Sequence, residues 1–167
     1  MPSRELADRM RKDTPEPFDI KLNLTLSLFL AEQLRSQSGR CYRDSCRALE
    51  RLLQMEVTNV RYVEGFALWQ AMGTYEATAH AWLLVDGEIV DVTRPAAYYF
   101  PATVYTVDDV RGQPHFPLFR DDRRAQHHLD AARAQAQARM RQLCPQPMAI
   151  WMADNSSPTS ETVLKAE

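Results

Sequence analysis

The sequence predicts a single domain of the α+β class, and three observations lead to this prediction. Apolar residues recur with helical spacing over Cys41–Gln54 and again over residues 121–143. Residues 57–69 and 77–91, which lie between these two helices, are rich in β-branched and aromatic residues, as strands are. The chain has 167 residues and is 45% hydrophobic, which is ordinary for a protein with one core.

The domain is expected to cover residues 18–145. Residues 1–17 carry charges and prolines with little apolar periodicity, so they are expected to form a flexible leader. Residues 146–167 are rich in Ser, Thr and Glu and are expected to be a largely disordered tail. The first residues lack the apolar stretch of a secretory signal, and no apolar run reaches the roughly 20 residues of a membrane span. A cytoplasmic protein is therefore expected, with no membrane partner.

Two helices are expected before the first strand. The first covers residues 18–37 and stops near Gly39. This segment could instead begin as a strand, because leucines alternate at positions 22, 24, 26 and 28. The second helix is Cys41–Gln54, which has its apolar residues on one side and no Gly or Pro inside it. Cys41 is therefore expected at the amino terminus of a helix.

The segment 77–91 contains a strong hairpin signal, the dipeptide Asp86-Gly87. A two-residue turn at this dipeptide pairs Val85 with Glu88. The same register then places Asp91 opposite Trp82, on the face of the sheet that His80 shares. His80 and Asp91 become diagonal neighbours with a Cα separation of roughly 7–8 Å. A three-residue bulged turn would reverse the parity and separate them.

The rest of the chain is expected to complete the sheet and cover it. Aromatic residues mixed with prolines around Tyr98-Tyr99-Phe100 predict an irregular loop that leads into a short edge strand at residues 103–106. Residues 121–143 form an amphipathic helix. Gly65 is expected at a bulge or a close approach of two backbones, and Glu64 is expected to be exposed.

Three of these residues have the chemistry of an acyl-transfer site. The unpaired N–H groups and the dipole of a helix amino terminus favour a thiolate, which suits Cys41 as a nucleophile. Such a thiolate needs a base that moves the proton and a third group that fixes the imidazole. His80 and Asp91 fit these two roles. Cys46, inside the helix, is expected to be a buried small hydrophobe, and an odd count of three cysteines argues against a disulfide framework.

The segments GRCYRDSCRAL, VRYVEGFALW and AHAWLLVDGEIVDVT resemble the core of the transglutaminase-like superfamily, whose members share a papain-like fold. The similarity is greatest to uncharacterised bacterial and phage proteins. The resemblance implies that Cys41 is the nucleophile, His80 the general base and acid, and Asp91 the orienting carboxylate. It implies a thiol-dependent hydrolase or transamidase that acts on a protein or peptide carboxamide without a cofactor. Tyr42 stands where many members have Trp, and the oxyanion could be held by Gln33, Gln37 or backbone N–H groups.

Other functions stay open. A non-catalytic interaction module could keep the fold and bind a partner through the Tyr98-Tyr99-Phe100 loop and the last helix. A nucleic-acid-associated protein could use the arginines of that helix, but the net charge of −2 and the interleaved aspartates make a nucleic-acid partner unexpected. His127 and His128 are adjacent on a helix and point apart, and no zinc-binding spacing occurs, so no metal is expected.

Overall fold

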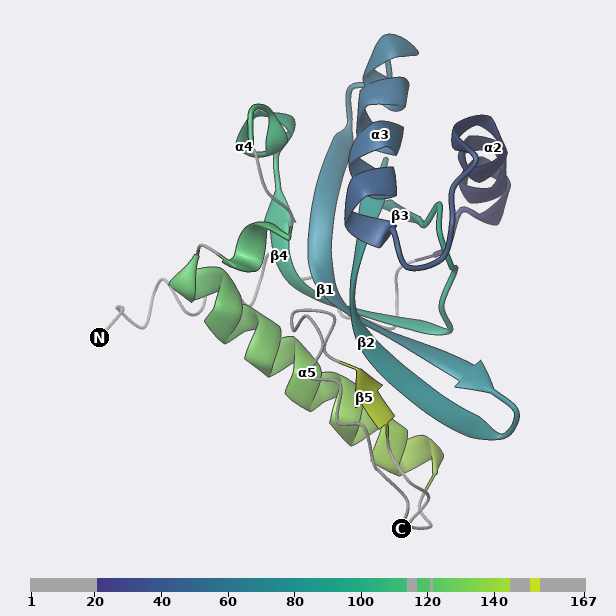
Figure 1. The fold of residues 1–167 in the computed structure, drawn as a ribbon, viewed down its shortest axis with the longest axis vertical. Coiled ribbons are helices and arrows are strands. Elements are labelled where there is room, and N and C mark those ends of the chain that lie inside the picture. The colour runs from purple at the N-terminus through teal and green to yellow at the C-terminus, as the bar shows by residue number, and fades with distance from the viewer. Residues whose placement is uncertain (1–20, 114–116, 121, 145–150, 154–167) are drawn as a thin grey trace, which may run out of the picture.

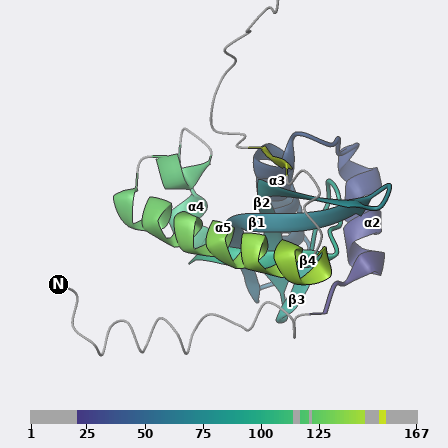
Figure 2. The same cartoon turned by 90° about the horizontal axis from the view of Figure 1, so that it is seen from below.

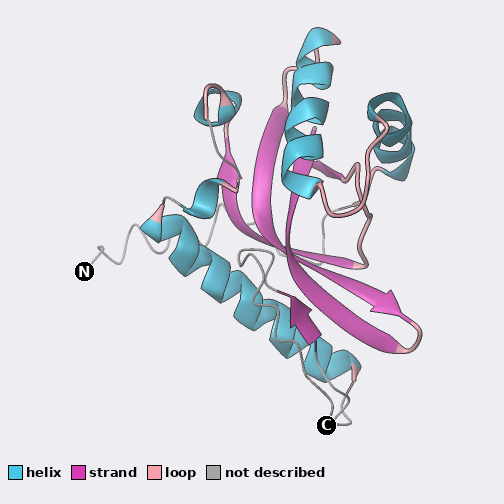
Figure 3. Ribbon diagram, in the orientation of Figure 1, coloured by secondary structure: helices cyan, strands magenta, loops and turns pink. Residues whose placement is uncertain are grey.

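The computed structural model describes residues 21–113, 117–120, 122–144 and 151–153. This part of the chain is α+β, with helices packed on a largely antiparallel sheet (Figures 1 and 3). The expected leader, residues 1–17, lies outside the described residues. Within the expected tail, residues 151–153 form a strand, and the other residues of that segment lie outside the described part.

The sheet has the strand order β3-β2-β1-β4. These strands are β1 (Val60–Ala71), β2 (Thr74–Val85), β3 (Glu88–Val90) and β4 (Tyr98–Tyr105), and each neighbouring pair is antiparallel. A fifth strand, β5 (Trp151–Ala153), pairs in parallel with the outer edge of β2. The sheet is therefore mixed, because β5 is parallel to β2. The sequence analysis did not predict this strand.

The predicted two-residue turn is confirmed. Asp86 and Gly87 have φ angles of 50° and 81°, the left-handed conformations that both central residues of a type I′ turn require. Val85 pairs with Glu88 as predicted, and Leu83 pairs with Val90. The hairpin therefore has the parity that places His80 and the residue after Val90 on one face.

The helices begin and end with local signals. The helix α2 (Leu24–Leu34) starts later than expected, because the side chain of Asn23 accepts a hydrogen bond from the backbone N–H of Leu26 and caps it. Just before this cap, Leu22 forms a single parallel bridge to the sheet at Ile89. The helix α3 spans Cys41–Gln54, as predicted.

Three further helical segments follow β4. They are α4 (Val107–Val110), the 3-10 turn η1 (Leu118–Arg120) and α5 (Arg123–Leu143), which Asp122 caps. Helix α5 lies along β1 and β4, and α2 lies next to β3 (Figure 2). None of the helices in the described ranges is long and apolar enough to cross a membrane.

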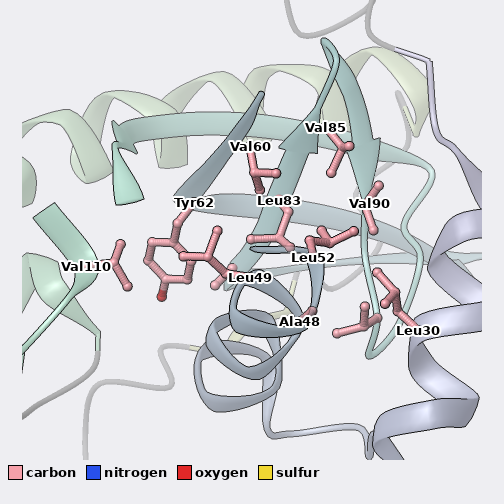
Figure 4. Close-up of a cluster of buried hydrophobic side chains, with 12 residues drawn as sticks. Leu30, Ala48, Leu49, Leu52, Val60, Tyr62, Leu83, Val85, Val90 and Val110 are labelled. Atoms are coloured by element: carbon pink, nitrogen blue, oxygen red, sulfur yellow. The ribbon is translucent and has the colours of Figure 1, made fainter. Parts of the chain in front are cut away.

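Side chains from α3 and α5 bury one face of the sheet. On this face α3 packs Ala48, Leu49 and Leu52 against Tyr62 and Leu83 (Figure 4). A second cluster joins α5 to the continuation of the same face, and its main members are Phe66, Leu68, Ala79, Leu129 and Met140. Each buried large side chain stabilises the fold by about 1.5–3 kcal/mol. This packing fixes the axis of α3, and with it the position of Cys41.

The opposite face carries a third cluster, which contains Val63, Trp69, Trp82, Ile89 and Tyr99. Side chains alternate along a strand, so odd-numbered residues of β1 reach this face and even-numbered ones reach the α3 face. Tyr99 belongs to β4, which begins at Tyr98 rather than near residue 103. The expected aromatic loop is therefore wrong, since Tyr99 and Phe100 are buried strand residues. An edge strand tolerates the proline that suggested a loop.

Gly65 lies at a close approach of β1 and β4 and at an irregularity in their pairing, which confirms the prediction for this residue. The register between the strands shifts at Glu64/Gly65, and a Cβ atom on Gly65 would stand 2.2 Å from the carbonyl oxygen of Phe100. The expectation for Glu64 is wrong, because its side chain is buried on the α3 face. Its Oε1 accepts hydrogen bonds from the hydroxyl of Tyr62 at 2.9 Å and the backbone N–H of Leu118 at 2.7 Å, which ties η1 to the sheet.

Candidate active site

Cys41, His80 and Asp91 lie together at the junction of α3 and β2. Cys41 is the first residue of α3, His80 lies in β2, and Asp91 follows directly after β3. All three are buried, with exposed fractions of 4%, 4% and 1%. The site thus combines one helix start with two strands of one hairpin.

The imidazole of His80 is joined to the carboxylate of Asp91. His80 Nε2 lies 2.8 Å from Asp91 Oδ2, the length of a strong charge-assisted hydrogen bond. The hairpin register accounts for this contact, because Leu83 pairs with Val90 and the next pair along places Asp91 opposite Trp82. A carboxylate at that point reaches diagonally across the hairpin to His80.

Asp91 is held by several further hydrogen bonds. Its Oδ1 accepts from the backbone N–H and the hydroxyl of Thr93 at 3.0 and 3.2 Å, and from the backbone N–H of Arg94 at 3.2 Å. Its Oδ2 also accepts from the hydroxyl of Tyr99 at 2.9 Å. The backbone N–H of Asp91 donates to Ser27 Oγ, on the buried face of α2, at 3.0 Å. The carboxylate therefore has a fixed position and a stabilised negative charge.

Electrostatics favour the charged form of the His80–Asp91 pair. Burial alone lowers the pKa of His80, but the negative charge of Asp91, its hydrogen bond and a hydrogen bond with the thiol of Cys41 raise it, so that the pKa reaches about 9. Burial alone raises the pKa of Asp91, but the charge of His80 and the hydrogen bonds from His80, Thr93 and Tyr99 lower it below its usual value of 3.8. At neutral pH the pair is an imidazolium and a carboxylate.

The thiol of Cys41 is hydrogen-bonded to the same imidazole. Asp91 engages Nε2, so Nδ1 is the ring nitrogen left for the sulfur. No side chain caps the start of α3 in the described structure. The first N–H groups of a helix lack intrahelical acceptors, and the helix dipole there favours negative charge. Cys41 thus lies between the imidazole of His80 and the amino-terminal end of a helix.

Three aromatic rings surround the His80–Asp91 pair. The ring of Trp69 meets that of His80 edge-on at 5.0 Å, and the ring of Trp82 stacks on His80 at 6.2 Å with an interplanar angle of 25°. The ring of Tyr99 meets Trp82 at 5.1 Å. These rings keep water away from the pair, and a low local dielectric strengthens its electrostatic contacts.

Sequence reasoning missed Trp69, Tyr99 and Ser27 as parts of this site. Trp69 could have been found, because a two-residue turn at Met72-Gly73 sets the β1–β2 register and places Trp69 on the face of His80. Tyr99 and Ser27 carry no local signal. They reach Asp91 through contacts that depend on the packing of β4 and α2.

The structure narrows the choice of oxyanion donors. Gln33 Oε1 accepts from the guanidinium of Arg51 at 3.3 Å. Arg51 lies ten residues along α3 from Cys41, about 15 Å at 1.5 Å per residue, so Gln33 is too far to serve. Gln37 is in the loop before α3, where its backbone N–H donates to Asp44 Oδ2 at 3.1 Å. The backbone N–H groups that open α3 belong to the same helix turn as Cys41, with no described side chain capping them.

The other candidate residues do not gather into a second site. Cys46 is half-buried, and burial together with Glu64 and Glu50 raises its pKa to about 12, which makes it a poor nucleophile. His127 and His128 lie side by side on α5 with ring centroids 6.4 Å apart. Among the described residues, no group of three or more His, Cys, Asp or Glu side chains is placed to hold a metal ion.

The arginines of the last helix contact the protein itself at two points. The guanidinium of Arg133 lies 5.2 Å from the ring centroid of Phe66 and pairs with Asp130 at 3.6 Å. The guanidinium of Arg139 lies 4.8 Å from the ring centroid of Tyr98. These two cations have local partners, which reduces the basic surface that α5 offers to phosphate groups.

The chain matches no protein-family model, and no curated protein or solved structure is significantly similar to it. Its function therefore has to be inferred from the residues and their geometry.

Proposed function

We propose that this chain is a thiol-dependent acyl-transfer enzyme with a papain-like core of the transglutaminase-like kind. Cys41 is the nucleophile, His80 the general base and acid, and Asp91 the orienting carboxylate. One observation carries the proposal: a buried imidazole is held between the thiol at the start of a helix and a hydrogen-bonded carboxylate. That arrangement supplies each group that thiol acyl transfer needs.

The chemistry follows from the positions of these groups. The Cys41 thiolate attacks the carbonyl carbon of a carboxamide or peptide, and the C–S bond forms while negative charge moves to the oxygen. N–H groups at the start of α3 stabilise this oxyanion. The imidazolium of His80 gives its proton to the leaving nitrogen, the C–N bond breaks, and a thioester remains. Water or an amine then attacks the thioester, His80 takes the proton of the attacking group, and the thiolate leaves.

Several features support this assignment over a purely structural role. A buried ionic pair costs several kcal/mol of desolvation, and replacing one with apolar side chains is often neutral or stabilising. Here the pair adjoins a thiol and is enclosed by Trp69 and Trp82. The substrate we propose is a protein or peptide carboxamide, in a cytoplasmic setting that keeps Cys41 reduced, and we propose no nucleic-acid partner.

Acylation by a small activated ester tests the proposal. With p-nitrophenyl acetate in excess, we expect a burst of one equivalent of nitrophenol and an acetyl thioester on Cys41, located by peptide mass spectrometry. Cys41→Ala abolishes the burst and the adduct. The matched control Cys46→Ala removes a thiol of the same helix and keeps both. Equal acylation of the wild type and Cys41→Ala would exclude the proposed nucleophile.

A further inference from the structure

The outer edge of β2 pairs with a different strand at each end, and the residues between the two pairings are buried. β3 pairs with residues 83–85, and β5 pairs with residues 76–78. In the described structure no strand pairs with the outer edge at residues 79–82. This interval contains His80, so the part of the edge between β5 and β3 lies at the candidate active site.

The direction of the backbone groups on this edge can be derived. The two-residue turn between β1 and β2 makes Ala71 and Thr74 a hydrogen-bonded pair, so even-numbered residues of β2 bond to β1 and odd-numbered ones face outward. The side chain of Ser45 agrees with this, because its hydroxyl donates to the outward carbonyl of Ala81 at 3.1 Å. The N–H and C=O of Ala77 and Ala79 therefore lie on the outer edge.

β5 runs along this edge toward the candidate site. Figure 1 shows β5 beside β2. Met152 is level with Ala77 and Ala153 with Thr78, in parallel, so a chain that continued in the direction of β5 would pass along β2 toward His80. An extended chain that continued for two more residues would advance about 7 Å and reach the level of His80. The path ends there, because Ser45, one turn into α3, occupies the next outward carbonyl.

We propose that the outer edge of β2 from Glu76 to Ala79 is a binding site for an extended polypeptide that runs parallel to β2, and that β5 is its intramolecular occupant. When β5 leaves, the outward N–H and C=O groups of this edge can bond to any main chain, so recognition tolerates many sequences. A polypeptide bound in this way is delivered to Cys41. That last step rests on the proposed function, whereas the binding itself does not.

β5 can be displaced from this edge. A strand of three residues is at the short end of the usual range and is held on one side only, so another main chain can displace it. The tail thus competes with substrate for one edge.

Peptide binding to the full chain tests the competition. Two proline variants of the full chain are compared, and both also carry Cys41→Ser to prevent turnover. The probe is a fluorescein-labelled peptide with the sequence of residues 148–155, MAIWMADN. Ala153→Pro prevents β5 from pairing, since it removes the N–H that donates to the carbonyl of Ala77 in the parallel ladder. Ser160→Pro, outside β5, is the matched control. If β5 fills the edge about three quarters of the time, the probe binds the Ala153→Pro chain about fourfold more tightly.

Methylated probes test the binding mode without changing the protein. The backbone groups of Ala77 face the bound strand. In a parallel ladder, the N–H at the Ala153 position, level with Thr78, therefore bonds to β2. The N–H at the Met152 position, level with Ala77, points away from β2. N-methylation at the Ala153 position should weaken binding at least about tenfold, the loss of about 1.4 kcal/mol or more, and N-methylation at the Met152 position should not. Equal effects at the two positions, or equal affinity of the two proline variants, would overturn the proposal. Acylation of Cys41 is measured separately, so failure of the binding site is distinguishable from failure of the thiol chemistry.

Discussion

Asp91→Asn removes one negative charge from the candidate site and keeps the shape of the side chain. The imidazole of His80 is buried, and the charge of Asp91 is the largest influence that raises its pKa against burial. Without that charge, burial dominates. We therefore expect the pKa of His80 to fall from about 9 in the wild type to below its usual 6.5 in the variant.

The size of the stability change follows from the pKa shift of His80. A rise from 6.5 to about 9 corresponds to about 3 kcal/mol, at 1.36 kcal/mol per pKa unit. The folded pKa of His80 is raised, so this stabilisation is fully present below pH 6.5 and is lost as the pH rises through 9. We compare the unfolding free energy of the wild type with that of Asp91→Asn. The advantage of the wild type should be about 3 kcal/mol larger at pH 6 than at pH 10.

Two measurements check this prediction. NMR of labelled histidines gives the pKa of His80, and urea unfolding at pH 6, 8 and 10 gives the stability difference. Glu76→Gln is the matched control, because it removes a charge of the same sign from β2 at a half-exposed position paired with Arg94. A wild-type His80 that titrates at or below 6.5, or a stability difference that does not change with pH, would refute the electrostatic account.

Two further predictions concern groups around the site. Tyr99→Phe removes a hydroxyl that donates to the charged Asp91, and should lower the unfolding free energy by about 1.5–3 kcal/mol; a loss near zero in urea unfolding would show that this hydrogen bond contributes little. Gly65→Ala places a methyl group 2.2 Å from the Phe100 carbonyl, so thermal unfolding should show a loss of about 3 kcal/mol or more. At Gly112, where the space is open but φ is 75°, the same change should cost about 1 kcal/mol, and equal losses at the two glycines would contradict the close approach of β1 and β4.

Local chemistry made part of the fold predictable. The apolar period and the absence of Gly and Pro defined Cys41–Gln54 to the residue. Asp86-Gly87 defined the turn, and through it the contact of His80 with Asp91, because strand parity carries a local signal across a hairpin. Both inferences involve residues that are close together in the sequence.

Contacts between distant segments were not predictable in this way. β4 was expected to be shorter, since Pro101 weakens its strand signal and only its place at the sheet edge allows that residue. Glu64 looked like an exposed strand residue, but η1 covers it. Ser27 and Tyr99 reach Asp91 only after α2 and β4 have packed, and β5 depends on a pairing with residues more than seventy positions earlier.

The reactivity of the three cysteines tests the central claim most directly. Iodoacetamide is applied at pH 6, and the alkylation rate of each cysteine is followed by peptide mass spectrometry, with the urea-unfolded chain as the reference. We expect Cys41 to react at least about tenfold faster than Cys46 or Cys144 in the folded protein, and to lose this advantage in Asp91→Asn. Equal rates at the three cysteines, or an advantage of Cys41 that persists without the Asp91 charge, would contradict an activated Cys41–His80–Asp91 site.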